Sequence, residues 1–185
     1  MNKQPAIFLD RDGVINQDHG YIDTVERFEF IEGVLPSLQA LRALQYRLIV
    51  VTNQSGIERG LYTEQAYHDV NDYMQQQLRQ HDFAFDAIYY CPHDGQYTTC
   101  DCRKPYPGML LAAQARFNID MEKSWMIGDK VTDVQAGRQA GVGTTCLVRS
   151  GQDLPQHALA EADWVLDSLA HLPAVLSPEK KSSLI

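Results

Sequence analysis

Short runs of apolar residues alternate along the chain with longer stretches whose apolar residues recur every three or four positions. A continuous apolar run is typical of a strand buried on both faces, and the longer spacing is typical of an amphipathic helix. The predicted strands cover residues 6–9, 48–51, 87–90, 124–127, 144–148 and 162–166. The predicted helices cover residues 34–44, 63–80, 107–118 and 132–141, with a short helix after Ser168. This alternation predicts an α/β fold, a Rossmann-like doubly wound parallel sheet with helices on both faces.

Residues with strong positional preferences mark the predicted helix boundaries. Thr63 is a candidate N-cap, Pro107 suits a first helical turn, and Gly141 suits a helix end. With 185 residues, 44% of them hydrophobic, the chain is long enough for one full core. We therefore expect a single domain over residues 1–176, followed by a flexible tail at 177–185.

The spacing of the predicted strand ends leaves no room for a second domain over the site. Only helices and one cysteine-containing loop separate Asp10 from Thr52, and Thr52 from Lys104. The sequence therefore predicts a site without a separate cap domain, open to solvent and bounded by three loops. These loops cover residues 13–30, 53–61 and 92–103.

Polar residues of complementary chemistry follow four of the predicted strands. In open α/β sheets ligands bind outside the carboxyl ends of the strands, so these residues should meet at one rim. They are Asp10 and Asp12, Thr52 and Asn53, Lys104, and Asp129 and Lys130. Asp and Asn are also common in solvated turns. Four strand ends that carry carboxylates, a hydroxyl and lysines favour a functional site over four unrelated turns.

The composition of this rim is that of a site that handles phosphoryl groups. Asp10, Asp12 and Asp129 offer hard oxygen ligands, and Mg²⁺ is usually held by one or two carboxylates together with substrate phosphate oxygens. An attacking carboxylate and a phosphate charge 4 Å apart repel each other by about 4 kcal/mol at an effective dielectric of 20. Attack by an aspartate therefore needs the opposing charge of a catalytic magnesium ion and of Lys104.

Three of the four cysteines lie in one short loop together with a histidine. Cys91-x-His93 and Cys100-x-Cys102 offer three thiolates and one imidazole, the closed ligand set of a tetrahedral zinc site. A redox pair of the Cys-x-x-Cys type is absent from the sequence. We expect a structural zinc that fixes the backbone just before Arg103.

The acidic charge balance limits the classes of partner. A net charge of −8 argues against nucleic acid as the main partner but permits a small anionic substrate in a locally positive pocket. No signal peptide and no long apolar segment can be read, so we expect a monomeric cytoplasmic protein without a membrane partner.

The segment FLDRDGVIN at residues 8–16 resembles the first motif of the haloacid-dehalogenase-like phosphatases, Asp-x-Asp-x-Thr/Val. Thr52-Asn53, Lys104 and Gly128-Asp129-Lys130 match the later motifs of that family in order. The resemblance implies that Asp10 is a nucleophile that forms an aspartyl-phosphate and that Asp12 is an acid and then a base. It also implies catalytic roles for Thr52 and Lys104.

A further set of segments, DHGY (18–21), VVTNQSGIERG (50–60), CDCRKPYPGML (100–110) and MIGDKVTDVQAG (126–137), resembles the branch of this family that dephosphorylates sugar bisphosphates. The resemblance implies a small-molecule sugar bisphosphate as substrate, in nucleotide-sugar synthesis for lipopolysaccharide. The substrate-binding residues that it implies are Asp18, His19, Gly20, Tyr21, Asn53, Gln54, Ser55, Arg103 and Lys130.

Two other functions remain open on the sequence. A histidinol-phosphate phosphatase carries a similar zinc loop, although Arg103 next to Lys104 favours a more anionic substrate. A phospho-accepting receiver module also places Asp, Thr and Lys at strand ends, but it lacks the zinc loop and the Asp-x-Asp spacing.

Overall fold

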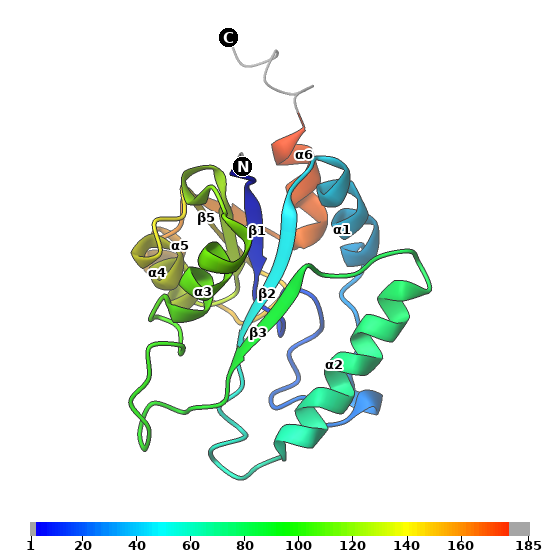
Figure 1. Cartoon of the computed structure of the whole chain (residues 1–185), viewed down its shortest axis with the longest axis vertical. Helices are drawn as coiled ribbons and strands as arrows, with labels where there is room; N and C mark the ends of the chain where they lie inside the picture. Colours follow the sequence, from blue (N-terminus) through cyan, green and yellow to red (C-terminus); the bar gives the residue numbers. More distant parts are fainter. Residues whose placement is uncertain (1–2, 178–185) are drawn as a thin grey trace.

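A computed structural model describes residues 3–177 of the chain, so residues 178–185 of the predicted tail lie outside the described part. Six parallel strands form one sheet in the order β3-β2-β1-β4-β5-β6 (Figure 1). The strands are β1 (Ala6–Leu9), β2 (Arg47–Asn53), β3 (Ala87–Cys91), β4 (Trp125–Gly128), β5 (Thr144–Val148) and β6 (Trp164–Leu166). The predicted doubly wound parallel sheet is confirmed.

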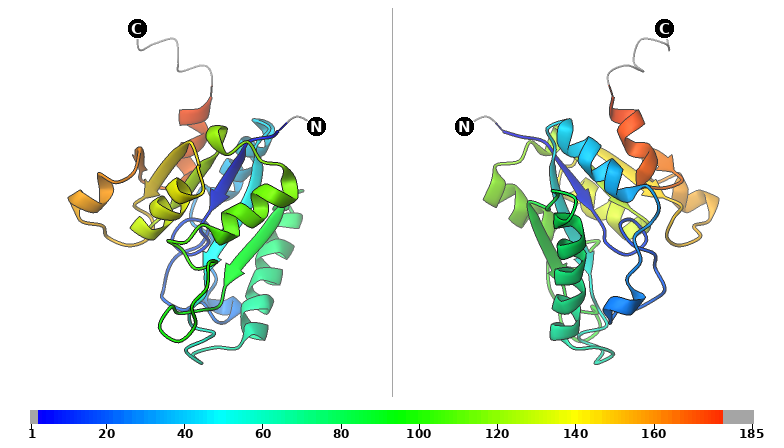
Figure 2. Two further views of the ribbon diagram at one scale, coloured as in Figure 1. Left: turned by 60° about the vertical axis from the view of Figure 1, so that its left-hand side comes forward. Right: turned by 90° about the vertical axis from the view of Figure 1, so that its right-hand side faces the viewer.

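Helices cover both faces of this sheet (Figure 1 and Figure 2). They are α1 (Val34–Ala43), α2 (Glu64–Arg79), α3 (Gly108–Phe117), α4 (Val131–Gln139), α5 (Gln156–Leu159) and α6 (Leu172–Leu176). The side chains of β1 alternate between two cores, because successive residues of a strand point to opposite faces. Ile7 and Leu9 pack with residues of α1, α2 and α6, whereas Ala6 and Phe8 pack with residues of α3 and α4.

The residues predicted to lie at helix ends are largely found there. Thr63 caps α2, since its Oγ1 accepts the backbone N–H of Ala66 at 3.1 Å. Gly141 follows α4 with a φ of 79°, a left-handed conformation that glycine adopts without strain. Pro107 lies immediately before α3 instead of inside it. The strand predicted at 162–166 begins only at Trp164, and the Asp163 carboxylate just before it accepts hydrogen bonds from the backbone and hydroxyl of Thr145.

The carboxyl ends of all six strands lie at one edge of the sheet, as the parallel order requires. Within the described residues, the segment between β1 and α1 contains only a 3-10 turn at Val25–Arg27, and the segment between β3 and α3 contains no helix or strand. The part of the chain that the structure describes therefore holds no separate cap domain. None of its helices has the length and apolar character needed to span a bilayer.

Candidate active site

Three buried carboxylates gather at the carboxyl end of β1. They belong to Asp10, which follows β1, to Asp129, which follows β4, and to Asp133 in the first turn of α4, and oxygens of all three lie within 4.8 Å of one another. The sequence prediction included Asp10 and Asp129 but not Asp133. Its position in the first helical turn after Asp129 is the one signal that could have identified it.

The ammonium group of Lys104 neutralises part of this charge. Lys104 Nζ lies 3.0 Å from Asp10 Oδ2 and 2.6 Å from Asp133 Oδ1, and it donates to the carbonyl oxygen of Val51 at 2.8 Å. Burial alone would lower the pKa of Lys104, but Asp10 and Asp133 raise it above its ordinary value. The ammonium therefore stays charged against the carboxylates.

A reciprocal pair of hydrogen bonds holds Lys104 in this place. The backbone N–H of Lys104 donates to Asn53 Oδ1, and Asn53 Nδ2 donates to the carbonyl oxygen of Lys104, both at 3.0 Å. Asn53 is the last residue of β2, so the sheet positions the lysine through this amide.

The carboxylate cluster fits a hard divalent cation. Asp129 Oδ1 is buried and has no hydrogen-bond partner among the described residues. A Cβ atom at Gly13, where φ is 82°, would stand 2.6 Å from Asp129 Oδ2, and one at Gly151 would stand 2.3 Å from it. Burial and the nearby Asp10 carboxylate raise the pKa of Asp129 to about 7. Three buried acids against one buried lysine leave negative charge that Mg²⁺ would balance, and the oxygen donors are of the type that it prefers.

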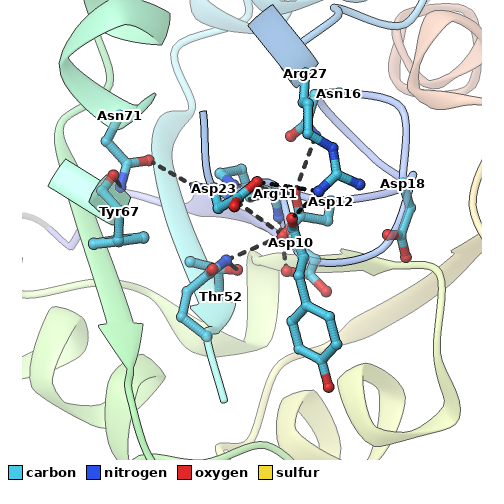
Figure 3. Close-up of polar contacts among 12 residues, drawn as sticks. Asp10, Arg11, Asp12, Asn16, Asp18, Asp23, Arg27, Thr52, Tyr67 and Asn71 are labelled. Atoms are coloured by element: carbon cyan, nitrogen blue, oxygen red, sulfur yellow. Dashed lines mark hydrogen bonds and ion pairs between the residues drawn. The ribbon is translucent and has the colours of Figure 1, made fainter. Parts of the chain in front are cut away.

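The Asp12 carboxylate does not belong to this cluster and accepts hydrogen bonds from three side chains, among them Arg11 and Asn16 (Figure 3). Arg11 donates to both of its oxygens, Asn16 Nδ2 donates to Oδ1 at 2.9 Å, and Gln54 Nε2 donates to Oδ2 at 3.0 Å. Burial would raise the pKa of Asp12, but the Arg11 charge and the hydrogen bonds from Asn16 and Gln54 hold it below its ordinary value. The suggestion that Asp12 ligates magnesium stays a prediction.

A pocket of about 300 Å³ opens beside these groups. Eight of the sequence-predicted residues line it: Asp12, Asp18, Gly20, Tyr21, Asn53, Gln54, Ser55 and Lys130. Tyr62 and Gln152, which the sequence analysis missed, complete the lining. A larger hollow of about 620 Å³ lies along α2 and contains none of the predicted residues, so the chemistry and not the volume identifies the site.

Gln54 and Lys130 connect the pocket to the acidic residues. The Gln54 amide donates to Thr52 Oγ1 at 2.9 Å as well as to Asp12, and it accepts from the Tyr62 hydroxyl at 2.6 Å. Lys130 Nζ lies 3.6 Å from an Asp18 oxygen and 3.5 Å from Asp129 Oδ1. Burial alone would lower the pKa of Lys130, but nearby carboxylates raise it, so the pocket wall carries a permanent positive charge.

Two predicted substrate residues lie elsewhere. His19 is exposed, with Nε2 3.9 Å from a Glu29 oxygen. Arg103 lines a separate hollow of about 140 Å³ beside the cysteine loop, together with Thr98 and Thr99. Its Nη1 donates to the carbonyl oxygen of His93 at 2.9 Å, which fixes the guanidinium against the loop.

The cysteine loop brings its four predicted ligands together. Cys91 Sγ lies 3.7 Å from both Cys100 Sγ and His93 Nδ1, and Cys102 Sγ lies 3.6 Å from His93 Nδ1. Around a tetrahedral zinc ion, neighbouring ligand atoms are separated by about 3.8 Å (two sulfurs) or about 3.6 Å (sulfur and nitrogen). The Cys91–Cys102 Sγ distance of 2.8 Å is shorter than that spacing. The donor set and three of these four distances fit zinc.

Proteins of similar sequence align with almost the whole chain. A protein of Salmonella typhi named D-glycero-beta-D-manno-heptose-1,7-bisphosphate 7-phosphatase is 49% identical over 183 residues, which are 96% of this chain and 97% of that protein. A Vibrio cholerae protein of the same name is 48% identical over 184 residues, 96% of this chain and 99% of that one. The chain belongs to this phosphatase family. A profile described as HAD-hydrolase-like also matches residues 101–172.

Membership of the heptose bisphosphate phosphatase family makes the chain a phosphoric monoester hydrolase, and the receiver-module alternative is set aside. The crystal structure of a B. bronchiseptica D,D-heptose 1,7-bisphosphate phosphatase complexed with magnesium and phosphate has the same fold. It superposes with a TM-score of 0.82 at 32% identity, over 93% of this chain and 97% of that one.

Proposed function

We propose that the chain removes the 7-phosphate of D-glycero-D-manno-heptose 1,7-bisphosphate, with magnesium as catalytic cofactor and zinc as structural cofactor. The observation that carries the proposal is the Lys104–Asp10 contact of 3.0 Å at the carboxyl end of the central strand β1. The names of the relatives support this substrate, because these proteins align with nearly the full length of the chain.

In the first step Asp10 is the nucleophile. A carboxylate oxygen of Asp10 attacks phosphorus, the bond from phosphorus to the sugar oxygen breaks, and Asp12 gives its proton to that oxygen. The charge that builds on the phosphoryl group lies beside Lys104, which stabilises it. Thr52 Oγ1 accepts from Gln54, and its own hydroxyl proton would be donated to a phosphoryl oxygen.

In the second step Asp12 takes a proton from water, whose oxygen attacks phosphorus and releases Asp10 and inorganic phosphate. Asp10 and Asp129 would hold magnesium, and the bound ion would supply positive charge that offsets the phosphate dianion and the attacking carboxylate. Asp12 must be protonated before the first step. The approaching dianion favours this, because a nearby negative charge raises the pKa of a carboxyl.

The second phosphate of the substrate is assigned to Arg103. The hollow that it lines offers a guanidinium group and the hydroxyl of Thr99, donors that suit a phosphate, whereas the Thr98 hydroxyl already donates to Glu58. Arg103 precedes Lys104 directly, so the two phosphates of one sugar would contact consecutive residues. The sugar itself would occupy the pocket lined by Asp18, Tyr21 and Lys130.

The product would keep its anomeric phosphate. Such a sugar 1-phosphate is the form that a nucleotidyltransferase converts into ADP- or GDP-heptose, and we place the reaction in the cytoplasm, where nucleoside triphosphates are made. The monomeric state stays a prediction, which light scattering coupled to size-exclusion chromatography checks.

The test compares kcat/KM for phosphate release from the α and β anomers of heptose 1,7-bisphosphate and from histidinol phosphate. We expect one heptose anomer, the β form by the names of the relatives, to be the best of the three substrates. Preference for histidinol phosphate would overturn the substrate assignment. Asp10→Asn should abolish both turnover and the phosphoenzyme, and near-normal turnover in that variant would overturn the covalent mechanism.

A further inference from the structure

An arginine stands between the two predicted catalytic aspartates, and it cannot reach a substrate. Arg11 is the largest fully buried side chain among the described residues, with 0% of its surface exposed. Arginine is almost never fully buried unless it is paired, because a charge removed from water needs compensating contacts. The contacts of Arg11 therefore indicate why it is there.

The guanidinium of Arg11 pairs with the Asp12 carboxylate (Figure 3). Arg11 Nε lies 3.2 Å from Asp12 Oδ1, and Nη2 lies 3.1 Å from both Oδ1 and Oδ2. Two nitrogens thus meet the carboxylate as a fork, which fixes the direction of its plane as well as its charge.

The opposite side of the guanidinium rests on helix α2. Arg11 Nη1 donates to Asn71 Oδ1 at 3.4 Å, and Arg11 Cζ lies 5.6 Å from the centre of the Tyr67 ring, within cation–π range. Tyr67 and Asn71 are one helical turn apart, so they share a face of α2.

The amide of Asn71 has its orientation set by the helix itself. Asn71 Nδ2 donates to the carbonyl oxygen of Tyr67 at 3.1 Å, which leaves Oδ1 to face Arg11. Both residues are buried, so the surface that receives the guanidinium is held by packing.

We propose that Arg11, seated on Tyr67 and Asn71, is a positioning residue that fixes the Asp12 carboxyl toward the leaving oxygen of the substrate. The inference rests on the proposed function, in which Asp12 is the acid. It assigns part of the catalytic geometry to α2, a helix that contributes no residue to the pocket lining. Asn16 and Gln54 hold the same carboxylate from other sides, but neither carries a charge.

The experiment compares two monoesters that lack a second phosphate, p-nitrophenyl phosphate and a simple alkyl phosphate. Nitrophenolate leaves without a proton, whereas an alkoxide needs the acid. The parameter kcat/KM reports steps only up to departure of the leaving group, so the later hydrolysis of the phosphoenzyme does not affect it.

Arg11→Lys keeps the charge and removes the fork. We expect kcat/KM for the alkyl ester to fall roughly 100-fold, as for a catalytic group displaced by about 1 Å, and that for the aryl ester to fall less than about 5-fold. A variant that merely folds less well loses the same factor for both esters. Equal losses would therefore overturn the proposal.

Tyr67→Leu supplies a second variant that leaves Arg11 in place, with Tyr73→Leu as its matched control on the same helix. Tyr73 packs against the core and lies near Phe28, with ring centres 6.1 Å apart. We expect Tyr67→Leu to lower the alkyl-to-aryl ratio of kcat/KM and Tyr73→Leu to leave it unchanged. If both variants changed the ratio alike, general loosening of α2 would be the cause and the proposal would be wrong.

Asp12→Asn separates this inference from the proposed function. If Asp12→Asn does not lower the alkyl-to-aryl ratio, Asp12 is not the acid and both ideas fall. If Asp12→Asn lowers it and Arg11→Lys does not, only the role of Arg11 is overturned. In the double variant Arg11→Lys should add no further change in the ratio, because residues that act as a unit are not additive.

Discussion

Removing the charge of Lys104 should destabilise the folded protein as well as stop catalysis. The ammonium is buried and lies within ion-pair distance of both Asp10 and Asp133. Lys104→Met keeps most of the side-chain length and leaves two buried carboxylates without their shared counter-ion. Removing one partner of a buried ion pair typically costs about 3–5 kcal/mol, since the remaining charge is left uncompensated.

We therefore expect Lys104→Met to lower the free energy of unfolding by about 3–5 kcal/mol when magnesium is omitted. Coulomb's law at an effective dielectric of 20 gives roughly 5–6 kcal/mol for each contact at these distances, before any desolvation is counted, so the expectation is a conservative one. Urea unfolding followed by circular dichroism measures the change. Added magnesium should recover part of the loss in the variant, because it supplies the missing positive charge.

A second substitution makes the reasoning refutable. In the Lys104→Met protein, Asp133→Asn removes a carboxylate that repels Asp10, so it should be less harmful there than in the parent protein. Neighbouring charges usually show coupling of about 0.5–3 kcal/mol in such cycles. Additive effects of the two substitutions, or a loss below about 1 kcal/mol for Lys104→Met alone, would show that the three groups are not electrostatically coupled.

Other predictions concern the metal loop, the second phosphate and a helix cap. Cys100→Ser should lower both the zinc content and the melting temperature, measured by metal analysis and calorimetry; full stability without zinc would refute a structural role. Mild chelation followed by magnesium alone should restore activity while zinc stays bound. Arg103→Ala should lower kcat/KM for the heptose bisphosphate roughly 10- to 150-fold relative to an aryl phosphate, the loss of one charged hydrogen bond; an unchanged ratio would contradict that role. Thr63→Ala should lower the free energy of unfolding by about 1 kcal/mol, and Thr63→Ser should restore it.

The sequence predicts the sheet and its polar rim because the strands are apolar throughout and end in polar residues. Each buried strand can be recognised from its run of apolar residues. The parallel order of the strands then brings Asp10, Thr52 and Asp129 to one edge of the sheet. The four residues of the proposed zinc site could also be predicted, because all four lie close together in the sequence and their side chains are of types that bind zinc.

Residues whose position depends on distant segments could not be read in the same way. In the sequence, Asp133 resembles an ordinary residue of a first helical turn. Only its contact in the folded protein with Lys104, which lies in another loop, marks it as part of the site. Arg11 looks like a surface charge between two acids, and only the approach of α2 buries it. The side-chain direction of Arg103 follows from its hydrogen bond to His93 within the metal loop, which no local pattern encodes.

The proposed magnesium and zinc sites lie at the ends of strands with different positions in the sheet. β1 is hydrogen-bonded to neighbours on both sides, whereas β3, which ends in the proposed zinc ligand Cys91, pairs within residues 3–177 only with β2, at the edge of the sheet. Local opening in native proteins requires the least free energy at such margins and the most in central strands. Amide protons of β3 should therefore exchange with solvent before those of β1, and loss of zinc should widen the gap. If Arg103 binds the second phosphate as proposed, a molecule that begins to open from this edge would lose that contact first, and it would cleave small esters without discrimination before all activity was lost.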